Sequence, residues 1–229
     1  MKQFNGTADH VRERFAEVRA RVDRSARQAG RTGDAVAILV ATKYVAADDM
    51  GVLRDAGVTL VGENRAQDLV AKHERFGSDF VFDFIGHLQS RKVKLVLPLV
   101  RLIHSVSTAS VVEELQGRAQ NPVDVLLEVN IAGEESKAGI AVGEADRFLD
   151  QAAGYDKVSF TGLMCMPPPF PDPELTAPYF AQARQLAADL STRWAGRYTF
   201  AQLSMGTSVD YEVAVREGAT IVRVGSVLF

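Results

Sequence analysis

Short apolar runs alternate with helix-patterned segments along the whole chain, and this alternation limits its fold more than any other feature. The apolar runs lie at 36–41, 58–61, 80–85, 102–106, 123–129, 158–163, 198–203 and 220–224. Helical patterning is found at 8–29, 47–56, 65–76, 90–97, 109–120, 142–153, 174–194 and 209–217. Strands that are apolar throughout are typical of a parallel sheet whose two faces are both covered.

Eight strand–helix units predict an α/β fold, a single closed (β/α)8 TIM barrel preceded by an extra N-terminal helix. An open doubly wound sheet is the alternative, because periodicity alone does not show that the sheet closes. A length of 229 residues fits one domain over 1–229, and neither a composition shift nor a linker divides the chain. The proline-rich stretch 167–173 is too short for a linker and is interpreted as a stiff loop.

Composition excludes several functional classes. The formal net charge of −3 gives no electrostatic footprint for nucleic acid or an anionic membrane. A single cysteine, Cys165, excludes an internal disulfide and a cysteine-built zinc site. No apolar run reaches membrane-spanning length, and the charged first 30 residues do not resemble a signal peptide. We therefore expect a soluble cytoplasmic protein that binds neither nucleic acid nor membrane.

Polar residues and glycines gather where the predicted strands end. In chain order these ends are Thr42-Lys43, Gly62-Glu63-Asn64, Gly86-His87-Leu88-Gln89, Ser105-Val106-Ser107, Asn130, Met164-Cys165-Met166, Ser204-Met205-Gly206-Thr207-Ser208 and Arg223-Val224-Gly225-Ser226. Parallel α/β folds bind ligands at the carboxyl ends of their strands. A functional site is therefore predicted at this edge.

Lys43 is the sharpest single feature. The chain has 7 lysines and 19 arginines, yet a lysine follows the first strand. Burial there would disfavour the ammonium form, and a neutral amine forms a Schiff base with an aldehyde, which arginine cannot do. The alternative is a lysine that extends to a loop carboxylate such as Asp48.

The last two strand ends have the composition of an anion site. Ser204 and the backbone N–H groups near Gly206, Gly225 and Ser226 would hold a phosphate, with the following helices adding their positive dipole ends. The alternative is that these glycines only permit tight turns.

Other polar residues carry weaker predictions. Arg223 lies inside the final strand and would either pair with Glu63 or Glu128 or face a ligand. His87 and His104 lack metal-ligand spacing, so we predict no metal.

Seven short motifs together resemble one family. They are Ala41-Thr42-Lys43, Gly62-Glu63-Asn64, Phe84-Ile85-Gly86-His87-Leu88-Gln89-Ser90, Ser136-Lys137-Ala138-Gly139, Gly162-Leu163-Met164, Ser204-Met205-Gly206 and Arg223-Val224-Gly225-Ser226. Their order and spacing resemble the pyridoxal 5′-phosphate (PLP) homeostasis protein family (YggS/PROSC type) over roughly residues 8–229. Each motif is weak alone, but the ordered set is specific.

The resemblance implies a PLP fold-type III barrel like the N-terminal domain of alanine racemase, without a second domain. It places the Schiff-base lysine at Lys43 and, opposite the pyridine nitrogen, Arg223. The other implied cofactor-binding residues are Asn64, Met205 and, at the phosphate, Ser204, Gly206, Gly225 and Ser226, the last two through backbone amides. Glu134 and Lys137 match a loop proposed for cofactor transfer.

Two positions depart from the family pattern. Asp83 stands where the family usually has histidine, and Thr207 replaces a common methionine. Neither change touches the lysine or the phosphate motifs, but Asp83 removes any role that the histidine would have.

The implied function is a monomeric PLP carrier with little or no catalysis, active in vitamin B6 and amino-acid homeostasis, with PLP-dependent apo-enzymes as partners. An arginine that faces the pyridine nitrogen keeps its own proton, so the ring stays unprotonated and is a poor electron sink. Two alternatives remain: a single-domain amino-acid racemase with Lys43 as base, and a barrel enzyme without PLP that forms a Schiff base with a sugar phosphate.

Overall fold

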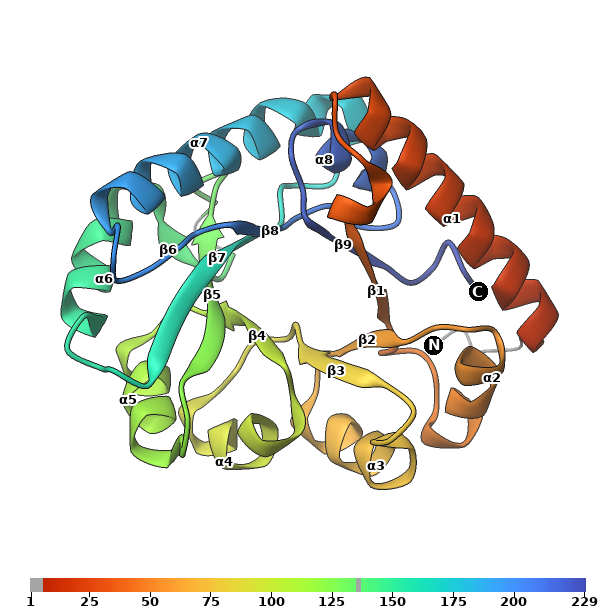
Figure 1. The fold of residues 1–229 in the computed structure, drawn as a ribbon, viewed down its shortest axis with the longest axis horizontal. Helices are drawn as coiled ribbons and strands as arrows, with labels where there is room; N and C mark the ends of the chain where they lie inside the picture. The colour runs from red at the N-terminus through yellow and green to blue at the C-terminus, as the bar shows by residue number, and fades with distance from the viewer. Residues whose placement is uncertain (1–5, 135–136) are drawn as a thin grey trace.

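The computed structural model describes residues 6–134 and 137–229, and its centre is a closed ring of parallel strands (Figure 1). The ring strands are β1 (Ala37–Ala41), β2 (Leu60–Glu63), β3 (Val81–Phe84), β4 (Leu102–Val106), β5 (Val123–Asn130), β7 (Val158–Cys165), β8 (Gln202–Ser204) and β9 (Ile221–Val224). β1 pairs with both β2 and β9, and β4 pairs with β5, so the sheet closes. The predicted TIM barrel is confirmed, and the open-sheet alternative is wrong. The short β6 (Ile140–Ala141) is added beside the end of β5.

Helices surround the ring (Figure 1). They are α2 (Met50–Asp55), α3 (Ala66–Phe76), α4 (Val93–Val96), α5 (Ala109–Arg118), α6 (Ala145–Ala152), α7 (Ala177–Arg193) and α8 (Tyr211–Arg216). Short 3-10 segments lie at Gly33–Ala35, Ala47–Asp49, Ser90–Lys92, Leu97–Leu99, Val142–Glu144 and Pro173–Thr176. No helix in the described ranges is both long and apolar enough to cross a membrane.

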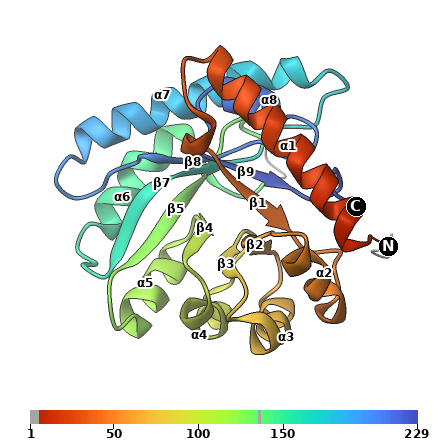
Figure 2. The same cartoon turned by 45° about the vertical axis from the view of Figure 1, so that its right-hand side comes forward.

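The N-terminal helix α1 (Ala8–Gln28) completes the outer layer. The Thr7 side chain accepts a hydrogen bond from the backbone N–H of His10 and caps the helix start. The buried stripe of α1 includes Val11, Val18 and Val22. The helix packs against α8 and α2 (Figures 1 and 2), while residues 225–229 after β9 form no helix. The predicted extra helix thus fills the place of an eighth βα helix.

The two faces of the strands bury different kinds of side chain. Ile38 and Val40 of β1 join the large apolar core between the sheet and the helices, whereas Leu39 joins a second, inner cluster. That inner cluster consists of Leu39, Leu102, Leu126, Met164 and Ile221. Because side chains alternate along a strand, the small cluster lies inside the barrel.

One predicted strand is displaced. The apolar run 198–203 was expected to form the seventh strand, but β8 is only Gln202–Ser204. Tyr198 packs edge-on against Phe160 at 5.3 Å between ring centroids, and Phe200 adopts a left-handed φ of 50° that no strand permits. These aromatic residues belong to the loop before β8, and their apolar character reflects packing rather than strand pairing.

Candidate functional site

A cavity of about 580 Å³ opens at the carboxyl ends of the strands. Among the predicted site residues, Lys43, Asn64, Arg223, Gly225 and Ser226 line it together. The remaining lining residues are Ala41, Tyr44, Ile85, Gly86, His87, Glu128, Ala138, Met164, Met166, Thr207, Ser208 and Val209. Strand ends far apart in the sequence therefore meet at one place, as the strand-end argument predicted.

Lys43 lies in the turn after β1 and is exposed. The expectation that it is desolvated inside the strand end is wrong, because the residue lies two positions beyond β1, where the chain has reached the cavity mouth. Its Nζ lies 5.0 Å from the ring centroid of Tyr44. Asp48, the alternative partner, pairs instead with Arg75. The amine is therefore accessible from the cavity.

Two other lysines near the cavity are engaged with carboxylates. The buried Lys72 pairs with Glu63. The Nζ of Lys137 lies 3.2 Å from Glu134 Oε1 and donates to the Pro167 carbonyl at 3.3 Å. Within the described residues Lys43 has no such ion pair, which leaves its amine free to react.

The residue before Lys43 is fixed from several sides. The Thr42 backbone N–H donates to Gly62 O at 3.1 Å, and the Thr42 hydroxyl donates to Glu63. Lys72 Nζ donates to Thr42 O at 2.8 Å. The buried Glu63–Lys72 pair thus holds the turn that presents Lys43.

Arg223 is buried inside the barrel, and its partners are neutral oxygens. Nη1 donates to the Ser204 carbonyl and to Ser204 Oγ, both at 2.6 Å, and Nη2 donates to the Cys165 carbonyl at 3.0 Å. Burial lowers the pKa of Arg223 from its ordinary value. Of the predicted alternatives, the ion pairs with Glu63 and Glu128 are absent in the described part of the chain, and Arg223 faces the cavity.

At the last two strand ends, the cavity is lined by Ser208 together with the predicted Gly225 and Ser226. The Ser208 hydroxyl accepts a hydrogen bond from the Gly225 N–H at 2.9 Å, and both residues line the cavity with Ser226. The Gly206 backbone has a φ of +88°, and a Cβ there would lie 2.5 Å from Ala214 Cβ on α8. Only glycine therefore allows the turn that delivers Thr207 and Ser208 to the cavity.

Ser204, Met205 and Gly206 are buried and do not line the cavity. The Ser204 hydroxyl is hydrogen-bonded to His104 and Arg223, and its predicted place at a phosphate stays a prediction. Of the two helices predicted to follow these strands, only α8, after β8, is present in the described residues. No helix follows β9 in the described residues, and the six-residue α8 has Asp210 at its N-cap, where Oδ1 accepts from the Thr207 N–H at 2.6 Å.

Two buried oxygens in the cavity wall have no hydrogen-bond partner in the described structure, Asn64 Oδ1 and Glu128 Oε2. Burial raises the pKa of Glu128, against the opposing effect of His87 and Arg223. Buried polar atoms without partners are unfavourable unless a ligand or water satisfies them. These two oxygens are therefore positions where a ligand or water would supply hydrogen-bond donors.

The loop after β5 is tied to the end of its strand. The Asn130 side chain donates to Glu134 O at 2.7 Å and accepts from the Glu134 N–H at 3.3 Å. Glu134 and Lys137 do not line the cavity, although Ala138 does. Ser136 of the resemblance motif lies outside the described residues.

Sequence reasoning did not assign His87, Glu128 and Ser208 to the site. His87 and Ser208 stand among the strand-end residues, and Glu128 lies two positions before Asn130 on the same face of β5. That period of two is the signal that would have found Glu128. No group of three or more potential metal ligands is present in the described ranges.

The barrel, the strand-end lysine and the buried arginine define the class of protein. The sequence profile of the family described as "Alanine racemase, N-terminal domain" matches residues 12–229. A pyridoxal phosphate homeostasis protein from Aquifex aeolicus is 37% identical over 95% of this chain and 96% of its own length. One from Escherichia coli K12 is 31% identical over 96% and 95%. The chain belongs to the pyridoxal phosphate homeostasis protein family, which confirms the resemblance.

Solved structures of similar proteins have the same fold as this chain. PipY from Synechococcus elongatus PCC7942 with PLP bound superposes with a TM-score of 0.82 and is 29% identical, covering 96% of this chain and 99% of its own. A protein of unknown function from Bifidobacterium adolescentis reaches a TM-score of 0.89 at 32% identity, covering 100% and 98%. A lysine/ornithine decarboxylase from Vibrio vulnificus, at 12% identity and a TM-score of 0.69, shares the fold alone.

Proposed function

We propose that this protein binds PLP as a Schiff base on Lys43 and serves intracellular PLP and amino-acid homeostasis with little or no catalysis. The observation that carries the proposal is the convergence in one cavity of the accessible Lys43 amine, the buried Arg223 and the Gly225–Ser226 turn. An aldehyde, a basic ring nitrogen and a phosphate are the three groups that these residues suit. The family membership and the PLP-bound PipY support the same ligand.

Each group of the ligand has a matching protein group. The Ser208 hydroxyl and the Ser226 N–H would hold the phosphate, joined by the Gly225 N–H once the ligand replaces Ser208 as its acceptor, and Lys43 would hold the aldehyde carbon. The unpartnered Asn64 Oδ1 would gain a polar partner. The buried Met205 and Gly206 support this turn, and their predicted part in binding the cofactor is kept in the proposal.

Low catalytic activity follows from Arg223. PLP supplies an electron sink for carbanion chemistry when its ring nitrogen carries a proton. A guanidinium only donates hydrogen bonds and keeps its proton, so the nitrogen beside Arg223 would stay an acceptor. The protein would therefore hold PLP without activating it.

A carrier needs a surface from which the cofactor can leave. Tyr44, Met166 and Val209 line the cavity and are 47%, 57% and 66% exposed. Exposed apolar side chains gathered at one place mark interaction sites. We propose PLP-dependent apo-enzymes as partners, a monomeric state, a cytoplasmic location, and a transfer role for the loop that holds Glu134 and Lys137.

The decisive experiment is borohydride reduction of the protein mixed with PLP, followed by peptide mass mapping. Wild type should show a visible Schiff-base band and a reduced adduct on Lys43. Lys43→Ala should show neither, and the matched Lys43→Arg variant should also fail because it restores only the charge. An adduct on Lys72 or Lys137 instead, or no adduct at all, would contradict the proposal.

A racemase is the second candidate, and Glu128 is the observation that favours it. Racemisation needs a proton donor or acceptor on each face of the substrate carbon. Lys43 would serve one face, and Glu128, whose pKa burial raises, lines the same cavity and would serve the other. Wash-in of deuterium at the α-carbon of any amino acid in a broad panel, lost in Glu128→Gln, would establish it. The sugar-phosphate alternative predicts borohydride trapping with a sugar phosphate rather than with PLP.

A further inference from the structure

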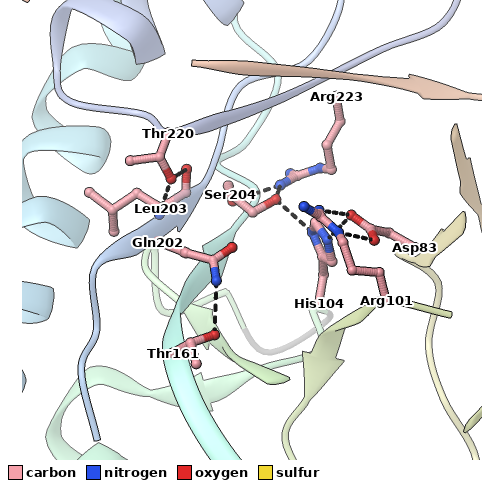
Figure 3. Close-up of polar contacts among 9 residues, drawn as sticks. All are labelled: Asp83, Arg101, His104, Thr161, Gln202, Leu203, Ser204, Thr220 and Arg223. Carbon is pink, nitrogen blue, oxygen red and sulfur yellow. Dashed lines mark hydrogen bonds and ion pairs between the residues drawn. The ribbon is translucent and has the colours of Figure 1, made fainter. Parts of the chain in front are cut away.

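A chain of polar side chains crosses the interior of the barrel and ends at the cavity (Figure 3). Arg101 donates from Nε and Nη2 to the two oxygens of Asp83, at 3.0 and 2.6 Å. Asp83 Oδ2 lies 3.1 Å from His104 Nε2, and His104 Nδ1 lies 2.8 Å from Ser204 Oγ. Ser204 Oγ accepts from Arg223 Nη1. These residues come from two pairs of neighbouring strands, β3 with β4 and β8 with β9, which the interior of the ring separates.

The chemistry of its ends gives this chain a direction. Arg223 can only donate, so Ser204 Oγ accepts from it and turns its own proton toward His104 Nδ1. Nδ1 must then be unprotonated, and the single ring proton of His104 lies on Nε2, where it is donated to Asp83. Asp83 closes the chain as the acceptor of three hydrogen bonds, two of them from Arg101.

We infer that Asp83, through His104 and Ser204, is a positioning residue that holds Arg223 in its orientation toward the cavity. The inference rests on the proposed function, because Arg223 is the group expected to meet the cofactor's ring nitrogen. It gives Asp83, where the family resemblance expects histidine, a defined role. The anionic end selects the tautomer of His104, and that tautomer selects the direction of the Ser204 hydroxyl.

The surroundings of His104 support a single protonation state. His104 is fully buried, and burial lowers its pKa against the opposing effect of Asp83; the charges of Arg223 and Arg101 lower it further. A doubly protonated ring would turn both nitrogens into donors. Ser204 Oγ would then face two donors, and its own proton would lose its acceptor.

The contacts with Ser204 and Cys165 occupy most of the N–H groups of Arg223, so only a few remain to bind a ligand. Nη1 is held by both Ser204 oxygens, and one Nη2 proton is held by Cys165. Because guanidinium has five N–H groups, Nε–H and one Nη2–H remain for a ligand. A change in the Ser204 hydroxyl direction would remove an acceptor from Nη1 and loosen this orientation.

The first test uses the protein without PLP. The chain has four histidines, so the ¹⁵N spectrum of histidine-labelled protein is simple enough to identify His104 by His104→Gln. We expect a neutral Nε2–H ring in wild type and a change toward the Nδ1–H form in Asp83→Asn. The reason is that the amide N–H of the asparagine introduced at position 83 would donate to Nε2 of His104, which must then be unprotonated. An unchanged tautomer in a folded Asp83→Asn would overturn the inference.

The second test measures PLP. Asp83→Asn and Ser204→Ala should still give the reduced Lys43 adduct, but PLP should bind about tenfold more weakly, the effect of losing one hydrogen bond to a charged group. The visible band should also titrate at a different pH. Asp146→Asn and Ser25→Ala are the matched controls, since both lie outside the barrel interior, and they should behave as wild type.

The two tests separate the possible failures. If wild type gives no Lys43 adduct, the proposed function fails, while the His104 tautomer still shows whether Asp83 sets the direction of the hydrogen bonds. If both folded variants bind PLP within twofold of wild type and their visible bands titrate at an unchanged pH, the hydrogen-bonded side chains from Arg101 to Arg223 only support the fold, and the inference is wrong. Should Asp83→Asn not fold, Ser204→Ala, which removes one oxygen, decides the PLP measurement.

Discussion

The barrel contains two buried clusters that each include a carboxylate and a cation, and they lie on opposite faces of neighbouring strands. Glu63 points outward from β2 and pairs with Lys72 of α3, with side-chain exposures of 0% and 4%. Asp83 points inward from β3 and pairs with Arg101, whose side chain is 46% exposed. The first pair is closed off from water, whereas the second is open to solvent at one end and leads to the cavity at the other.

The outward pair and the inward cluster therefore have different roles in the site. The Glu63–Lys72 pair joins a strand to the helix that follows it, and its additional bonds to Thr42 fix the backbone below Lys43. The inward chain joins strands that are distant in sequence and reaches the ligand side. Outward polar groups therefore fix the backbone of the site, and inward polar groups set the chemistry of its wall.

The largest stability effect is expected from breaking the closed pair. Glu63→Gln leaves the Lys72 ammonium buried without a counter-charge, which costs about 3–5 kcal/mol of unfolding free energy. Asp83→Asn should cost less, because Arg101 can turn to solvent when its partner is lost. Urea unfolding of both variants measures the comparison.

The double variant Glu63→Gln/Lys72→Met is the control for stranded charge. It should recover part of the loss seen in Glu63→Gln, because no unpaired charge then remains buried. The distinction between the two clusters would be contradicted if the loss in the double variant equalled the sum of the losses in Glu63→Gln and Lys72→Met alone. A larger loss in Asp83→Asn than in Glu63→Gln would also contradict it.

A smaller, pH-dependent effect is expected from the inward cluster. The folded pKa of His104 lies below its unfolded value of about 6.5, so the unfolded chain takes up a proton more readily. The contribution of His104 to stability is therefore unchanged above pH 6.5 and is lost as pH falls below it. The slope reaches about 1.4 kcal/mol per pH unit for one proton.

His104→Gln is the comparison for this prediction. Its own stability will differ from wild type, but the loss between pH 6.5 and 5.5 should be smaller by up to about 1 kcal/mol. Urea unfolding at several pH values gives both slopes. Equal slopes in the two proteins would mean that His104 does not supply this part of the acid sensitivity.

The barrel could be predicted from the sequence because each strand is an unbroken apolar run, and each run is a local feature. The strand before Ser204 shows where this fails. Tyr198 and Phe200 have the composition of a strand, yet their packing against Phe160 places them in a loop. The role of α1 as the last member of the outer layer also depends on tertiary packing alone.

The site could be predicted as a set of strand ends but not in its details. Lys43 and Arg223 were found because charge at a strand end is unusual. Ser204 alternates with the outward Leu203 and so faces the barrel interior, where it contacts Arg223. Its contact with His104 depends on how β4 and β8 are staggered around the ring, which no local pattern records.

The smallest effect is expected at the exposed pair that was the alternative partner of Lys43. Asp48 pairs with Arg75 at the surface, with side chains 82% and 49% exposed, so Asp48→Asn should change the unfolding free energy by less than about 1 kcal/mol. Because Lys43 makes no contact with Asp48, PLP affinity should stay within twofold of wild type. A marked fall in the yield of the Lys43 adduct in this variant would show that a carboxylate does control the amine. The accessible lysine at the cavity mouth would then need a partner that the structure does not give it.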